Sequence, residues 1–175
     1  MPETRSVTVR EATPEDARAI AEVHVRSWQT AYRGELPDDY LDGLSVDERA
    51  SGWTGRLAEP PLGVETFVAE DGGRVIGFTG FGPTRDGDAP AGTGEVYTLY
   101  LLPGWVGRGV GRELFACAND RLRELGYPRA TLWVLATNER SRRFYEQAGW
   151  TFDGTESTHQ DQCQNLPIVR YAAAL

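Results

Sequence analysis

The chain has 175 residues, 40% of them hydrophobic and 25% charged, with a formal net charge of −8 at pH 7. This length fits one domain with an adequate core, and no apolar run approaches the ~18 residues that a membrane span needs. The acidic balance and the lack of a Lys/Arg tract argue against nucleic acid as a partner.

The two cysteines are far apart in the sequence. Cys117 is on the face of a predicted helix and Cys163 is in a polar stretch. They form neither a disulfide framework nor a metal-ligand pattern, so we expect no metal. Together with a polar start, residues 1–5, that does not resemble a signal peptide, this favours the cytoplasm. A homodimer is compatible with the sequence.

The N-terminal third is predicted to form one strand and two helices. The alternation of Val7 and Val9 predicts the strand. Residues 13–16 combine an N-cap, an N1 proline and early acids, which is typical of a helix start, and this helix ends near Gly34. A capping-box pattern at Ser45 begins the second helix.

His24, Trp28 and Tyr32 are spaced by four residues and therefore lie on one side of the first predicted helix. Core packing with one satisfied histidine and the wall of a substrate pocket both fit this spacing. In the second case the aromatic rings would attract an ammonium group, and the acidic balance of the chain favours the same cationic substrate.

A hairpin and a long loop are predicted next. The strands at 65–70 and 74–81 are joined by Asp-Gly-Gly, which is a good hairpin signal. The glycine-rich stretch 82–94 shows no periodic pattern and leads directly to Glu95. Such a loop is typical of a mobile flap beside an active site, and substrate would then enter between this loop and the first helix. A solvated hairpin loop without a function fits the sequence equally well.

Residues 95–112 join an apolar strand to a glycine-rich turn and then to a helix. Gly107, Gly109 and Gly111 let the backbone turn tightly and approach a ligand closely, and apolar residues at helical spacing begin at Val110. Free N–H groups and the positive end of the helix dipole converge at such a turn, so we expect it to bind a phosphate. A purely structural turn would show the same glycine spacing.

Two other nucleotide-binding patterns were compared with this loop. A Walker loop requires Gly-Lys-Ser/Thr, and the sequence has Gly-Arg-Glu at 111–113, which excludes it. A Rossmann loop requires its first glycine directly after the strand and an acidic residue at the end of the next strand. Here residues 102–106 intervene and the next strand ends in Thr137-Asn138, so the Rossmann interpretation remains only as an alternative.

The C-terminal part is predicted to complete the sheet. A strand at 130–135 follows the central helix, so strand, helix and strand form a right-handed parallel crossover. Asn138 caps a helix that ends at Gly149, and strands at 150–153 and 168–173 follow. The order of elements predicts a single α/β domain with a mixed central sheet flanked by helices.

The loop sequence VGRGVGR and, further along, NERSRRFYEQAGW together resemble the GCN5-related N-acetyltransferase (GNAT) superfamily. The resemblance implies a GNAT-like fold, acetyl-coenzyme A as co-substrate, no metal, and transfer of acetyl to a primary amine of a small molecule or peptide. It implies that loop amides hold the pyrophosphate. Val106 stands where the family motif has Gln or Arg, so one side-chain contact to the cofactor is lost. Arg108 and Arg112 could partly replace this contact. The loop comprises Gly107, Arg108, Gly109, Val110, Gly111 and Arg112.

The same resemblance implies roles in the chemistry. Glu95 matches a base that deprotonates the amine directly or through water, and Tyr145 matches a tyrosine that protonates the departing thiolate. Asn138 matches a residue that contacts the cofactor. The pantetheine arm would pair with backbone groups of a strand, with the last of these residues as oxyanion donor. These residues are Leu99, Tyr100 and Leu101.

Each of these residues also has a structural interpretation. Glu95 fits a solvent-facing strand edge, Tyr145 an apolar helix face and Asn138 a helix cap. The alternative function is a binding module that senses acyl-coenzyme A without turnover. Glu95 and Tyr145 together favour the enzyme, because a binding module needs neither a base nor a thiolate donor.

Overall fold

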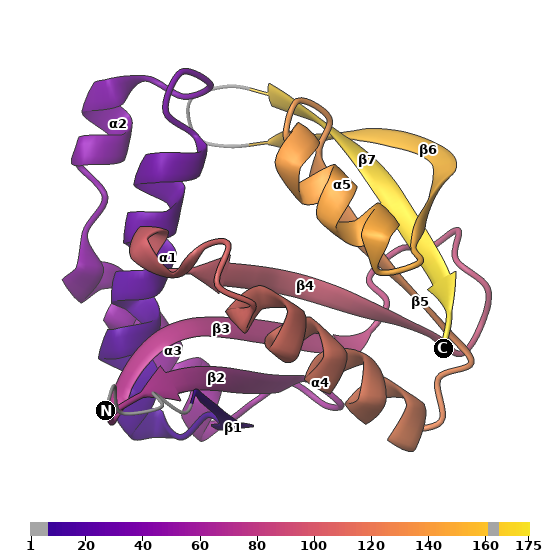
Figure 1. The fold of residues 1–175 in the computed structure, drawn as a ribbon, viewed down its shortest axis with the longest axis horizontal. Helices are drawn as coiled ribbons and strands as arrows, with labels where there is room; N and C mark the ends of the chain where they lie inside the picture. The colour runs from indigo at the N-terminus through magenta and orange to yellow at the C-terminus, as the bar shows by residue number, and fades with distance from the viewer. Residues whose placement is uncertain (1–6, 161–164) are drawn as a thin grey trace, which may run out of the picture.

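A seven-stranded mixed sheet runs through the computed structural model, which describes residues 7–160 and 165–175 (Figure 1). Its strand order is β1-β2-β3-β4-β5-β7-β6, and every neighbouring pair is antiparallel except β4 and β5. The strands are β1 (Thr8–Glu11), β2 (Glu65–Asp71), β3 (Arg74–Pro83), β4 (Thr93–Leu101), β5 (Arg129–Leu135), β6 (Thr151–Gln160) and β7 (Asn165–Ala174). The predicted mixed sheet is confirmed, and Cys163 lies outside the described residues.

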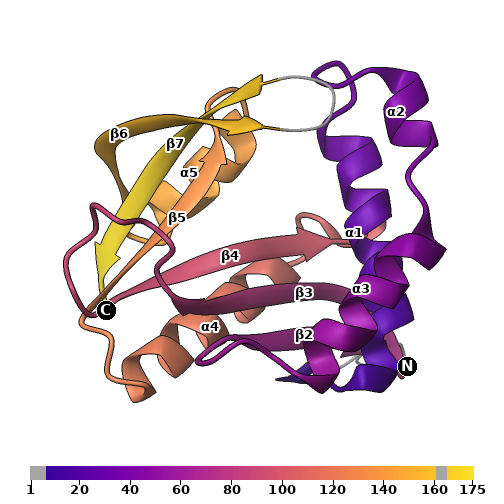
Figure 2. The same cartoon turned by 180° about the vertical axis from the view of Figure 1, so that it is seen from behind.

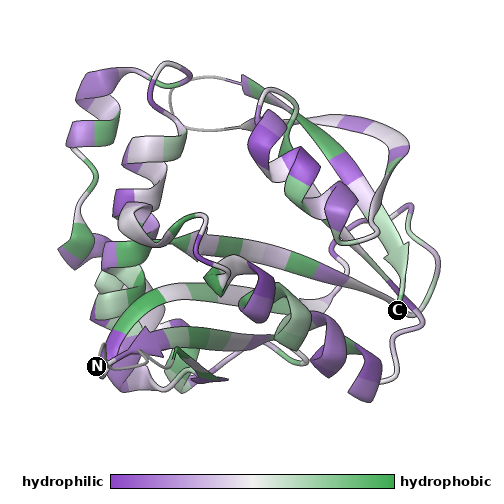
Figure 3. Ribbon diagram, in the orientation of Figure 1, coloured by the Kyte–Doolittle hydropathy of each residue, from purple (hydrophilic) through white to green (hydrophobic). Residues whose placement is uncertain are grey.

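The helices cover both faces of this sheet. Helices α1 and α3 lie against one face, and α4 and α5 lie on the other (Figures 1 and 2). Their bounds are η1 (Pro14–Asp16), α1 (Ala17–Ala31), α2 (Asp38–Asp42), α3 (Val46–Ala58), η2 (Pro103–Trp105), α4 (Val110–Glu124) and α5 (Glu139–Gln147). Hydrophilic residues dominate α5 (Figure 3), and no helix of the described residues is long and apolar enough to cross a membrane.

Local sequence signals account for most of these elements. The side chain of Ser45 caps α3 by accepting a hydrogen bond from Glu48 N, and the predicted hairpin forms as β2 and β3. The last hairpin is longer than predicted, because β6 continues to Gln160. Its outer part, TESTHQ, is polar, as befits a strand at the edge of a sheet, and therefore lacks the apolar alternation that predicts a strand.

Strands β4 and β5 pair only at one end. Residues 93–95 of β4 face residues 129–131 of β5, and beyond them the strands diverge while β4 stays paired with β3 as far as Leu101 (Figure 1). A bulge at Tyr97 separates the paired residues Val96 and Thr98. The sheet therefore has a split between β4 and β5 that is closed at Glu95 and open toward Leu101.

An apolar cluster lies at the open end of this split. It combines residues of α1 and α2 with the ends of β5 and β7, so it links the two halves of the sheet. The buried members are Trp28, Leu36, Leu41, Leu135 and Leu166, and Tyr32 and Tyr100 pack against them.

The loop between β3 and β4 is anchored rather than free. Glu95 binds both the guanidinium and the backbone N–H of Arg85, and the indole N–H of Trp133 donates to Asp86 at 3.0 Å. Arg170 donates to Asp88 at 2.9 Å. The expected flap is therefore replaced by a loop fixed to three strands, which lies near the C-terminus and away from α1 (Figure 2).

Arg170 is the buried centre of a cluster of charged side chains. Its side chain is 9% exposed and contacts Asp86, Asp88 and Asp153. The hydrogen bond from Arg170 holds the pKa of Asp88 below its usual value. Burial alone would raise the pKa of Asp153, but the hydrogen bonds from Arg170 and Thr155 outweigh it and lower that pKa.

Replacing this guanidinium should destabilise the fold in a pH-dependent way. We expect Arg170→Met to lower the free energy of unfolding by about 3 kcal/mol near neutral pH, because three carboxylates lose their counter-ion. The contribution of the lowered carboxyl pKa values is present above the unfolded pKa of about 3.9 and is lost as the pH falls below it. The difference in unfolding free energy between the wild type and Arg170→Met, measured by urea unfolding, should therefore shrink from about pH 7 to about pH 3.5.

The matched control is Arg123→Met. It removes an exposed ion pair with Asp120 on α4, which should cost less than about 1 kcal/mol. Equal losses in the two variants, or a loss in Arg170→Met that does not change with pH, would contradict the counter-ion role of Arg170.

Candidate active site

The glycine loop forms the N-terminus of α4, as predicted. Gly107 and Gly109 have φ angles of 82° and 89°, a region that side chains rarely adopt, and Gly109 is the N-cap residue of the helix. A Cβ placed on Gly111 would lie 3.4 Å from Leu101. The loop is therefore shaped to expose the first N–H groups of α4 to an anion.

Exposed arginines surround this helix N-terminus. Arg108 lies over the ring of Trp105 at 5.3 Å, and Arg140 of α5 lies 3.4 Å from the Cβ position of Gly107. No carboxylate of the described residues forms an ion pair with Arg108, Arg112 or Arg140. Arg140 was not among the residues predicted to bind the cofactor, although the basic run ERSRR after Asn138 was a signal for it.

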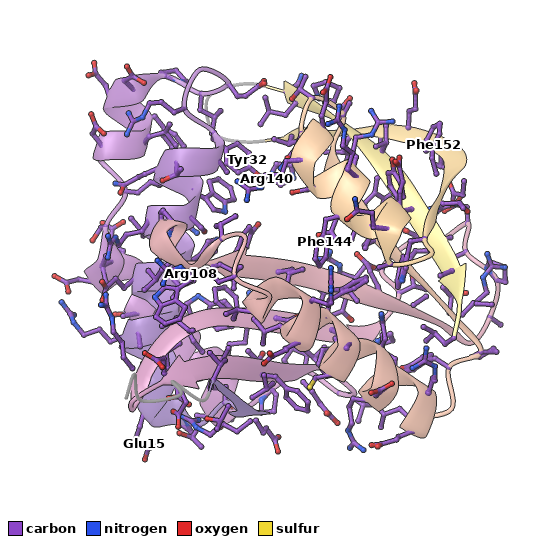
Figure 4. The ribbon with its side chains drawn as sticks, in the orientation of Figure 1. Glu15, Tyr32, Arg108, Arg140, Phe144 and Phe152 are labelled. Atoms are coloured by element: carbon purple, nitrogen blue, oxygen red, sulfur yellow. The ribbon has the colours of Figure 1, made fainter. Side chains whose placement is uncertain are left out.

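A hollow of about 700 Å³ adjoins the arginines, between the end of α1 and the start of α5. Arg108, Arg140, Phe144 and Tyr32 border the open space seen between these helices in Figure 4. Asn138 lines the hollow and also caps α5 by accepting a hydrogen bond from Ser141 N at 3.1 Å. Its predicted capping role is confirmed, and its side-chain nitrogen is left for a ligand.

The backbone of β4 presents alternate residues to the split. Leu102 N donates to Ile76 O on β3 at 2.9 Å. Because N–H groups alternate in direction along a strand, Tyr100 N also points to β3, whereas the N–H groups of Leu99 and Leu101 point into the split. Two of the three predicted backbone contacts therefore face the ligand side, and that of Tyr100 does not.

Tyr145 reaches this split from α5. It is 9% exposed and packs against Phe115 at 5.3 Å. Burial, with the neighbouring Tyr100 hydroxyl, raises the pKa of Tyr145, so the phenol stays protonated at neutral pH. The predicted apolar environment of Tyr145 is confirmed, and its proton-donating role stays a prediction.

Glu95 lies at the closed end of the split and is 1% exposed. Its Oε1 accepts from Arg85 Nη2 at 2.7 Å, and its Oε2 accepts from Arg85 N at 2.8 Å. The interpretation as a solvent-facing glutamate is therefore wrong. Since the Arg85 side chain is 65% exposed, it can leave the carboxylate, but an acceptor amine would have to displace it.

The three aromatic residues of α1 gather around Tyr100. His24 stacks on the Tyr100 ring at 5.3 Å, and Trp28 stacks on Tyr32 at 4.6 Å. Burial, followed by the charges of Arg49 and Arg56, lowers the pKa of His24 to about 3, so this histidine is neutral. Its Nδ1 has no partner among the described residues, which contradicts a fully satisfied core histidine.

Two parts of the predicted acceptor site need correction. The aromatic residues of α1 meet Tyr100, whereas the 84–92 loop is anchored at Glu95, about 16 Å away along β4. Helix α1 and this loop therefore share no entrance. In addition, Arg49 of α3 already lies over the ring of Trp28 at 5.2 Å, where a cationic substrate was expected.

The site and fold match a known family. The model of the acetyltransferase (GNAT) family matches residues 19–150, so this chain belongs to that family. It is 41% identical over 133 residues to the uncharacterized N-acetyltransferase YuaI of Bacillus subtilis (strain 168), a match covering 75% of this chain and 73% of that protein. The family predicted from the two sequence motifs is therefore confirmed.

Solved structures agree with this fold. The PaiA N-acetyltransferase from Thermoplasma acidophilum, in complex with coenzyme A, has a TM-score of 0.73 at 20% identity, covering 97% of this chain and 99% of that chain. YncA from Salmonella typhimurium, with acetyl-coenzyme A, has a TM-score of 0.71 at 24% identity, covering 96% of this chain and 93% of that chain. The Rossmann alternative is wrong, since β1 to β4 are antiparallel neighbours.

The glycine loop can be tested by placing a charge on it. We expect Gly109→Asp to abolish binding of acetyl-coenzyme A in calorimetry, because a carboxylate at the N-cap repels the phosphates and competes for the N–H groups. Gly126→Asp is the matched control, because Gly126 at the other end of α4 has a φ of 90° and open space around it. Wild-type affinity in a folded Gly109→Asp protein would refute the phosphate assignment.

Proposed function

We propose that this chain transfers the acetyl group of acetyl-coenzyme A to a primary amine by direct attack in a ternary complex. The observation that carries the proposal is the position of Tyr145, which lies beside Tyr100 where β4 and β5 have separated. The open end of the same split lies near the glycine loop, and the N–H groups of Leu99 and Leu101 point into it. A cytoplasmic location and a homodimer remain predictions from the sequence.

Residues of the split would hold the cofactor along its length. The loop at Gly107 to Arg112 binds the pyrophosphate, and the arginines around it neutralise charge. The N–H groups of Leu99 and Leu101 pair with the amide-containing arm. Leu99 also packs against the cluster that contains Tyr145. We therefore assign the oxyanion contact to the N–H of Leu99. It lies two residues before Leu101, the donor predicted from the sequence, and thus nearer the closed end of the split.

The chemistry requires one bond to form and one to break. The amine nitrogen attacks the thioester carbon, the carbonyl oxygen becomes an oxyanion, and the C–S bond then breaks to release the thiolate. Tyr145 donates its hydroxyl hydrogen to the departing sulfur, and this proton passes to the thiolate. Glu95 takes the amine proton through water once Arg85 has moved away, and solvent returns a proton to Tyr145.

Thiol release distinguishes this enzyme from a sensor of acyl-coenzyme A. We expect the purified chain to release coenzyme A from acetyl-coenzyme A only when an amine acceptor is present. Binding of acetyl-coenzyme A without thiol release across a broad amine panel would favour the sensor.

The role of Tyr145 can be tested by removing its hydroxyl. We expect Tyr145→Phe to lower kcat about a hundredfold while changing the Kd of acetyl-coenzyme A less than about twofold, since the hydroxyl acts on the departing thiolate. Tyr171→Phe is the control: its hydroxyl binds Arg142 and Glu146, so stability should fall while kcat is retained. Unchanged turnover of Tyr145→Phe, where chemistry limits the rate, would remove it from the mechanism.

The role of Glu95 can be tested with a pair of variants. Glu95→Gln keeps the shape of the side chain and should lower kcat about a hundredfold, because an amide does not accept the proton. Arg85→Gln removes the ion pair but keeps the carboxylate, so it should retain most of the activity. Equal losses of activity and of unfolding midpoint in both variants would instead make Glu95 an anchor of the 84–92 loop.

A further inference from the structure

A positive charge without an ion-pair partner among the described residues lies where α1, α3 and β4 meet. Arg49 is half-buried and lies over the Trp28 ring at 5.2 Å. Its guanidinium forms no ion pair or hydrogen bond with any residue in the described ranges 7–160 and 165–175. Half-buried arginines normally pair with carboxylates, so a free one beside an active site indicates an anionic ligand.

A second donor next to Arg49 also lacks a partner. Trp28 is 9% exposed, and its indole N–H is buried without a hydrogen bond to any described residue. The indole is close enough to the Tyr100 hydroxyl to affect its pKa, but the two do not meet hydrogen-bond geometry. A buried N–H without a partner costs about 1–3 kcal/mol, and an oxyanion bound to it would recover that cost.

The charged groups that act on His24 and Tyr100 are positive. Arg49 and Arg56 are the charged neighbours that act on His24, and Arg49 is the charged neighbour that acts on Tyr100. No described carboxylate contributes to either group. A cationic group placed here would face a guanidinium and a neutral histidine, whereas an anion would meet two donors.

Tyr100 connects Arg49 and Trp28 with the proposed reacting centre. The hydroxyl of Tyr100 has Trp28 and Arg49 as neighbours, and it is also the neighbour of Tyr145. A ligand bound to Arg49 therefore extends toward the thiolate donor. Apolar side chains, among them Leu36 and Leu135, form the adjoining cluster and suit an apolar substituent.

We propose that the acceptor carries an acid group as well as its amine, as an apolar amino acid does, and that Arg49 and the Trp28 indole N–H bind this acid group. The inference rests on the proposed acetyltransferase function. It replaces the purely cationic acceptor expected from the net charge, and it separates this acceptor class from peptide N-termini, which have no carboxylate next to the amine.

Matched acceptors test the proposal in the thiol-release assay. The panel contains leucine, methionine and phenylalanine, each beside its primary amide and its decarboxylated amine. We expect kcat/KM to be at least tenfold higher for the acids than for the amides. In addition, the acids should raise the unfolding midpoint of the complex with coenzyme A, a readout that does not depend on turnover.

Variants of Arg49 identify the group responsible. Arg49→Gln should raise the KM of the acids ten- to a hundredfold with little change for the amides, so that the preference disappears, and Arg49→Lys should restore part of it. Trp28→Phe keeps the ring but removes the N–H and should raise the KM of the acids several-fold. Arg18→Gln, at an exposed position of α1 where the arginine pairs with Asp47, is the matched control and should keep the preference.

The other outcomes of these experiments refute either the acid site or the acetyltransferase function. Amides or simple amines that react as well as the acids, or an Arg49→Gln effect equal for all acceptors, refute the acid site and leave the acetyltransferase intact. Acids that neither react nor shift the unfolding midpoint also refute it. Thiol release from none of a wider amine panel, with acetyl-coenzyme A bound, refutes the proposed function itself.

Discussion

The incomplete pairing of β4 with β5 is the constraint on which the site depends. Parallel strands normally satisfy each other's backbone groups along their length, but here only residues 93–95 and 129–131 are paired. Beyond them the N–H groups of Leu99 and Leu101 face the split, and a buried backbone group without a partner is unfavourable. A ligand with amide groups along an extended arm can complete the sheet, so the binding energy comes from hydrogen bonds that the fold leaves unmade.

The split is held at both ends. At the closed end, Glu95 fixes the loop that carries Arg85, and Arg170 connects the same loop to β7. At the open end, the apolar cluster joins Trp28 of α1 to Leu135 of β5 and Leu166 of β7. Because contacts of two different kinds brace the two ends, the space between the strands is built into the fold and can position two reactants.

The sequence predicted the elements whose signals are local. The glycine loop, the cap at Asn138 and the turn between β2 and β3 each depend on a few adjacent residues, and the structure has them where they were expected. The partner of Glu95 and the guanidinium over Trp28 were not predictable, because each depends on a pairing between elements that no periodic pattern encodes. The family resemblance identified positions, but the neighbours of those positions required the fold.

Net charge was a poor guide to the acceptor for a related reason. A charge of −8 describes the whole surface, and salt screens exposed charges over about 8 Å, so distant carboxylates contribute little inside a pocket. Many acidic side chains are also already paired, such as Asp16 with Arg10 and Glu65 with Arg121. What a bound acceptor meets is the local arrangement, in which Arg49 is close, half-buried and weakly screened. An acidic protein can therefore contain a site that selects an acid group, provided that its few unpaired cations are the ones facing the substrate.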